Sequence, residues 1–135
     1  MRGDFCHNEV LTKRLRQAAE ACDAMVQTEA PICIEGNTCY GDLLIRKEVR
    51  IILCELEDSC RRVENDWRKA IAFGAGILLI ATPDAPTAHA CRRRLRQCAK
   101  WNASLKVIIC PLGAAIEILR QILTTDGPKR KENEP

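Results

Sequence analysis

Apolar side chains recur along this chain with two different periods, and the change of period separates predicted helices from predicted strands. Between residues 9 and 27 they return every three or four positions, at Leu11, Leu15 and Ala18 among others. Charged side chains occupy the other faces of the same segment. This spacing predicts an amphipathic helix.

Three short segments with the pattern of strands follow in close succession, at residues 31–36, 41–46 and 47–57. We expect turns between them at residues 37–40 and 46–48. Connections this short favour an antiparallel meander over helical crossovers.

From residue 60 onward, helical periodicity alternates with continuous apolar runs. The segments GILLIATP (76–83) and LKVIICP (105–111) are apolar almost throughout, which is typical of strands covered on both faces. Helical spacing predicts helices at residues 60–73, 86–100 and 113–123.

The predicted order of elements is therefore α-β-β-β-α-β-α-β-α, which indicates the α/β class. We expect residues 1–124 to form a single domain, in which helices flank a mixed sheet. Residues 125–135 are polar, and we expect them to form a disordered tail.

Composition limits the class of protein. The chain of 135 residues is 47% hydrophobic but only 4% aromatic, so the expected core is aliphatic. No apolar run approaches the roughly 18 residues of a membrane span, and the first ten residues lack the apolar segment of a secretory signal. We therefore expect a cytoplasmic protein that does not associate with membranes.

Nine cysteines are an odd number, which argues against a complete disulfide framework. In a cytoplasmic protein they are expected to be reduced and mostly buried. Cys33 and Cys39 are six positions apart, as are Cys54 and Cys60, whereas paired zinc ligands are usually closer. A structural zinc site stays open as an alternative.

The third predicted strand carries the acidic residues of most interest. Along Ile51, Leu53, Glu55 and Glu57 one face of the strand is first apolar and then acidic. Two ionised carboxylates beside an apolar strand repel each other and lose hydration, and a divalent cation relieves both penalties. If the second and third strands pair through the short turn, Asp42 lies close to Glu55.

These residues resemble those of a known nuclease superfamily. In the PD-(D/E)xK enzymes, which include restriction endonuclease-like and Holliday junction resolvase-like proteins, an αβββαβ core carries an Asp on the second strand and D/E-x-K on the third. The segments GDLLI (41–45) and ILCELE (52–57) are similar to these two strands. The resemblance implies a Mg²⁺- or Mn²⁺-dependent endonuclease, a hydrolase of DNA, with Asp42 and Glu55 as metal-binding and catalytic residues. We expect Glu57, on the same strand face, to bind the metal as well or to position the attacking water.

The sequence departs from that motif at two positions. Gly41 replaces the proline, and Glu57 replaces the lysine, which gives an E-x-E variant. The missing positive charge must then come from another side chain or from a second metal ion. Lys69 and Arg62 lie seven positions apart on the following predicted helix and either could reach the acids. Their alternative role is that of an ordinary solvated helix face.

The best candidates for contact with DNA are Arg92, Arg93, Arg94 and Arg96, because guanidinium groups bind phosphates in bidentate geometry. Arg62 is a further candidate. A net charge of +3 is compatible with such a partner but does not require one.

Two alternatives remain open at the level of sequence. Glu57 in place of lysine is also expected in a catalytically degenerate protein of this fold that serves as a DNA-binding or assembly subunit. The acids are also compatible with the exposed edge of a different α/β sandwich. An active enzyme of this size that cuts both strands of a duplex is expected to act as a homodimer.

Overall fold

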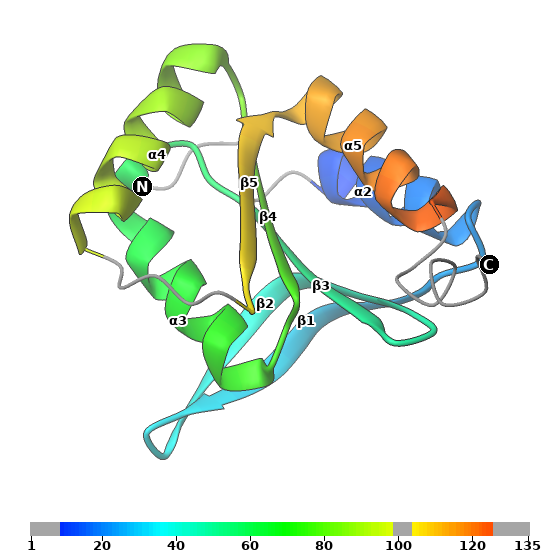
Figure 1. The fold of residues 1–135 in the computed structure, drawn as a ribbon, viewed down its shortest axis with the longest axis horizontal. Coiled ribbons are helices and arrows are strands. Elements are labelled where there is room, and N and C mark those ends of the chain that lie inside the picture. Colours follow the sequence, from blue (N-terminus) through cyan, green and yellow to red (C-terminus); the bar gives the residue numbers. More distant parts are fainter. Residues whose placement is uncertain (1–8, 99–103, 126–135) are drawn as a thin grey trace, which may run out of the picture.

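The computed structural model describes residues 9–98 and 104–125, and a five-stranded mixed sheet forms its centre (Figure 1). The strands follow the order β1-β2-β3-β4-β5, with antiparallel pairing from β1 to β3 and parallel pairing from β3 to β5. Their bounds are β1 Met25–Ile34, β2 Asn37–Lys47, β3 Arg50–Leu56, β4 Ile77–Thr82 and β5 Lys106–Pro111.

Helices cover both faces of this sheet, with α2 and α5 on one side and α3 and α4 on the other (Figure 1). The predicted order of elements and the α/β class with a mixed sheet are thereby confirmed. The helices are α2 Glu9–Glu20, η1 Cys60–Arg62, α3 Val63–Phe73, α4 Ala85–Cys98 and α5 Leu112–Thr124.

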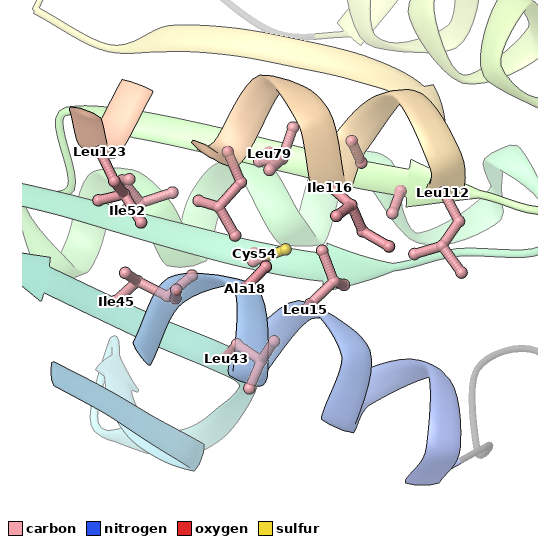
Figure 2. Close-up of a cluster of buried hydrophobic side chains, with 14 of the residues drawn as sticks. Leu15, Ala18, Leu43, Ile45, Ile52, Cys54, Leu79, Leu112, Ile116 and Leu123 are labelled. Atoms are coloured by element: carbon pink, nitrogen blue, oxygen red, sulfur yellow. The ribbon is translucent and has the colours of Figure 1, made fainter. Parts of the chain in front are cut away.

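An aliphatic core fills the space between the sheet and each pair of helices. Figure 2 shows the cluster beneath α2 and α5, where side chains from both helices meet those of β2, β3 and β4. Residues at even positions of β3, such as Ile52, belong to this cluster, while Leu53 belongs to the cluster beneath α3 and α4. The sheet is therefore covered on both faces, as the apolar run of β4 predicts.

The first predicted helix is too long. Helix α2 ends at Glu20, and residues 25–27 belong to β1 instead. Asp23 adopts a left-handed conformation (φ 64°) that stops the helix, and Met25 to Thr28 then pair with Arg46 to Leu43 of β2. Hydrogen bonding along this strand pair outweighs the helical periodicity of the sequence.

The predicted turns are also displaced. Residues 37–40 lie within β2, because the chain reverses earlier, at Glu35 and Gly36, which both have positive φ. The second turn lies at Glu48 and Val49 rather than at residues 46–48. Glycine adopts such a conformation without strain, which explains why the reversal falls at Gly36.

The hairpin of β1 and β2 changes faces partway along its length. Val26 and Leu43 lie on the side of α2 and α5, whereas Ile32 and Gly41 lie on the side of α3. Val26 and Ile32 are six positions apart on β1, and Gly41 and Leu43 are two positions apart on β2, so regular strands would place both members of each of these pairs on one face. The change occurs between them, where Glu29 has φ 50° and the ladder lacks its pairing with Asp42.

Three remaining expectations concern the chain as a whole. The predicted disorder of residues 125–135 falls, apart from Thr125, outside the described residues. The eight cysteines within the described residues are free thiols. Within residues 9–98 and 104–125, none of the helices has the length and apolar character needed to cross a membrane.

We predict that Gly41→Ala lowers the free energy of unfolding by about 1–3 kcal/mol, the usual effect of overpacking. An added Cβ would lie 2.6 Å from Leu53 Cδ1 and 3.7 Å from Glu55 Oε2. Leu53 is fully buried in a close-packed interior, so its side chain can yield only by displacing its neighbours. Urea denaturation followed by circular dichroism measures the change.

Gly113→Ala is the matched control, because nothing lies within 4 Å of the added Cβ there. Its free energy of unfolding should stay unchanged or rise slightly, since alanine favours a helix more than glycine. Equal stability of Gly41→Ala and the wild type would contradict the close packing at Gly41.

Candidate metal centre

The acidic site begins at the end of β3, where two glutamates follow one another on the same face of the strand. Glu55 lies within β3 opposite Ile80 of β4, and the N–H of Glu57 donates to the carbonyl of Ala81 at 3.0 Å. This bond continues the parallel pairing one residue beyond β3. Both glutamates are thereby held on the side of the sheet that α3 covers.

Asp42 of β2 and Glu55 are joined by reciprocal hydrogen bonds. The N–H of Asp42 donates to Glu55 Oε2 at 2.9 Å, and the N–H of Leu56 donates to Asp42 Oδ2 at 2.8 Å. The predicted proximity of Asp42 and Glu55 is confirmed. The lost pairing between Asp42 and Glu29 leaves the Asp42 N–H to bind a carboxylate instead of a strand carbonyl.

Helix α3 adds two polar residues to this site from its buried face. Lys69 Nζ lies 3.1 Å from Glu55 Oε1 and donates to the Tyr40 carbonyl at 2.8 Å. The same ammonium lies 3.9 Å from Asp66 Oδ1, one turn earlier on α3. Lys69 is only 9% exposed, so its charge is used within the protein.

Among the described residues, the carboxylates close enough to share a metal ion belong to Glu55, Glu57 and Asp66, and Asp42 is not one of this group. One oxygen of each lies within 4.8 Å of those of the other two, and the residues are 2%, 3% and 1% exposed. Within the part of the chain that the structure describes, neither oxygen of Asp66 has a hydrogen-bond partner. A buried carboxylate without hydrogen bonds costs several kcal/mol, so this arrangement calls for a cation or for protons.

The pKa values of these groups reflect the same deficit of positive charge. Burial, followed by the negative charge of Asp42, raises the pKa of Glu55 to about 7 although Lys69 lowers it. Burial, followed by the charge of Glu55 and by the Glu57 carboxylate, raises the pKa of Asp66 well above its usual range. For Lys69, burial lowers the pKa, but the charges of Glu55 and Asp66 outweigh it and the net shift is upward.

The donor set suits a hard divalent cation. Three carboxylates converge from two elements, and one of them, that of Asp66, is buried with no hydrogen bond to either oxygen. Mg²⁺ and similar ions prefer oxygen ligands, and carboxylates supply both the atoms and the charge. The single ammonium of Lys69 cannot neutralise three carboxylates, whereas a divalent ion together with Lys69 can.

The other predicted residues lie elsewhere. Arg62 is exposed in η1, so of the two candidate cations only Lys69 reaches the acids. The first turn of this segment is a 3-10 helix, which breaks the seven-residue spacing on which the shared face depended. Arg93, Arg94 and Arg96 are exposed on α4.

Arg92 has a structural contact on the neighbouring strand. Its Nε and one terminal nitrogen both donate to the carbonyl of Ile109, at 3.1 and 2.8 Å. This contact ties α4 to β5. Arg92 is therefore the member of the arginine cluster whose side chain is already engaged within the protein.

Asp66 is the residue that the sequence interpretation missed. It stands in the charged segment RRVENDWRKA, where it looks like part of a solvated face. Val63 lies three positions before Asp66 and Ala70 four positions after it, so the helical period places all three on the buried face. This spacing is the signal that could have identified it.

Comparisons with known proteins indicate no function for this arrangement. No family model matches the chain, and no curated protein matches it. Among solved structures, the crystal structure of AF1548, a protein of unknown function, is similar with a TM-score of 0.49 and 8% identity. The similarity covers 72% of this chain and 56% of that protein, so the chain spans little more than half of its length. A likeness at this level assigns neither a family nor an activity.

We predict that the metal-free protein loses stability as the pH rises from about 4.5 to about 7. Folding keeps the proton on Glu55 through this window because its pKa is raised from 4.5 to about 7, while the unfolded chain releases it. The contribution of Glu55 is on the order of 3 kcal/mol. Urea unfolding in the presence of a chelator, at a series of pH values, measures it.

Glu55→Gln should reduce this dependence, because the amide does not titrate, whereas burial still raises the pKa of Asp66. Glu117 is exposed on α5, outside the site. Glu117→Gln makes the same change of residue there and should follow the wild type. A metal-free wild type that gains stability between pH 5 and pH 7 would contradict the raised pKa values.

Proposed function

We propose that this protein is a metal-dependent DNA phosphodiesterase of the endonuclease type, with Mg²⁺ or Mn²⁺ held by Glu55, Glu57 and Asp66. The observation that carries the proposal is the Asp66 carboxylate, which is buried without a hydrogen-bond partner and faces two further carboxylates. When bound, such an ion stabilises charge on a phosphoryl oxygen and favours ionisation of a nearby water.

Asp42 serves this site by orienting Glu55. Its N–H fixes one oxygen of the Glu55 carboxylate, and its own carboxylate is fixed by the Leu56 N–H. Asp42 also adds negative charge beside Glu55, which raises the pKa of Glu55 and would equally attract a metal cation.

Lys69 supplies the positive charge that the motif lysine provides in the nuclease superfamily, where this chain has Glu57. Its ammonium lies 3.1 Å from Glu55, so it is close enough to stabilise negative charge that develops on a phosphoryl group at the site. The ammonium reaches the acids from α3 instead of from β3. The loss of the strand lysine is therefore compatible with catalysis.

DNA is the proposed substrate, and the exposed guanidinium groups of Arg62, Arg93, Arg94 and Arg96 are proposed to bind its phosphates. Arg92 takes part less directly, because its side chain binds the Ile109 carbonyl. We further propose that the protein works in the cytoplasm, consistent with the free thiols of the described residues, and that it cuts duplexes as a homodimer.

A second candidate function is a DNA-binding or assembly subunit without catalysis. The observation that favours it is the burial of the three carboxylates, which are at most 3% exposed. A phosphodiester would reach them only after a local movement of the chain. In this case the acids would serve the stability of the fold.

We predict Mn²⁺-dependent cleavage of DNA that falls by about 100-fold or more in Glu55→Gln and in Asp66→Asn, since loss of an electrostatic contact at a reacting centre has this size. End-labelled single-stranded, duplex and branched substrates, separated on denaturing gels, measure the rate. Glu117→Gln is the matched control and should cut at the wild-type rate.

Two results would count against the phosphodiesterase. Cleavage that survives in both site variants would point to a contaminating enzyme. Binding of these substrates without cleavage in Mn²⁺ or Mg²⁺, by a folded wild type, would favour the non-catalytic subunit.

A further inference from the structure

Lys69 occupies the position where a bound cation would neutralise the acidic residues. Its ammonium lies 3.1 Å from Glu55 Oε1 and 3.9 Å from Asp66 Oδ1, and these residues are two of the three that form the carboxylate group. A divalent ion between the same carboxylates would share Glu55 with this ammonium. Two like charges that compete for one buried carboxylate repel each other strongly.

We propose that Lys69 is an internal counter-ion that must leave Glu55 before a divalent ion is bound there, so that metal binding frees its ammonium for the phosphate of the substrate. The inference rests on the proposed metal centre. Lys69 then lowers the affinity of that centre for metal, and its freed ammonium stabilises the phosphate of the substrate.

The Tyr40 carbonyl explains how Lys69 can leave Glu55 without leaving the site. It accepts a hydrogen bond from Nζ at 2.8 Å, shorter than the 3.1 Å contact with Glu55, and it carries no net charge for a metal ion to compete for. Lysine has a flexible stem and three donors, so one bond can persist while another breaks. The ammonium then stays at the rim of the acidic group.

The two oxygens of the Glu55 carboxylate also support the role of Lys69 as a counter-ion. One of its oxygens is fixed by the Asp42 N–H, and the other is held by Lys69. Without Lys69, the second oxygen would be available for a ligand that carries more charge. Glu55 therefore binds either the ammonium or the divalent ion at this oxygen.

The test is isothermal titration calorimetry with Mn²⁺ alone on four proteins: the wild type, Lys69→Gln, Lys69→Arg and Lys106→Gln. We expect Lys69→Gln to bind Mn²⁺ about tenfold more tightly than the wild type, the low end of what one nearby charge does to a buried group. Lys69→Arg keeps the charge and should not gain affinity. Lys106 is exposed on β5. Lys106→Gln makes the same change in charge there and should match the wild type.

The outcomes separate this inference from the proposed function. Equal or weaker binding by Lys69→Gln, with a wild type that binds Mn²⁺, would overturn the role of Lys69 and leave the metal centre intact. No binding by any of the four proteins would remove the metal centre itself. Binding by Lys69→Gln alone would support the role of Lys69 and would contradict the Mn²⁺-dependent cleavage proposed for the wild type.

Loss of Lys69 leaves the buried carboxylates without their counter-ion, so the variant is less stable when metal-free. If Lys69→Gln is unfolded without metal, circular dichroism in Mn²⁺ replaces the titration. Folding on addition of Mn²⁺ supports the inference, because the ion then takes over the neutralising role of Lys69. A variant that stays unfolded at saturating Mn²⁺ overturns it.

Discussion

The carboxylate of Glu55 joins the three elements that make up the site. One oxygen accepts the backbone N–H of Asp42 on β2, the other accepts the ammonium of Lys69 on α3, and the residue itself belongs to β3. A buried carboxylate needs such partners, because without them its charge would be too costly. The position of α3 on the sheet and the local geometry of β2 at Asp42 both serve this requirement.

The need of the buried Glu55 carboxylate for partners also shapes the hairpin of β1 and β2. Its change of faces at Glu29 and Asp42 brings Gly41 against Leu53 beside Glu55, and the absence of a side chain at Gly41 permits this close approach. Left-handed backbone at a glutamate is unfavourable and persists only where the surrounding contacts enforce it.

The sequence predicts the parts of the fold that local pattern controls. Continuous apolar runs identified β4 and β5, and the short turn between β2 and β3 placed Asp42 near Glu55. The sequence pattern did not predict the end of α2, because the pairing of Met25 with Arg46 depends on contacts between residues distant in sequence. Asp66 was missed because a charged residue in a helix is usually solvated, although its spacing from Val63 and Ala70 places it on the buried face of α3.

We propose that Glu55, Glu57 and Asp66 together bind one divalent cation. The decisive test is a crystal soaked in Mn²⁺ and measured near the manganese absorption edge. If the three residues bind the ion, an anomalous difference peak lies between these three carboxylates, with both Glu55 and Asp66 among its ligands. A well-ordered site without a peak at saturating Mn²⁺, or a peak that leaves Asp66 uncoordinated, would contradict it.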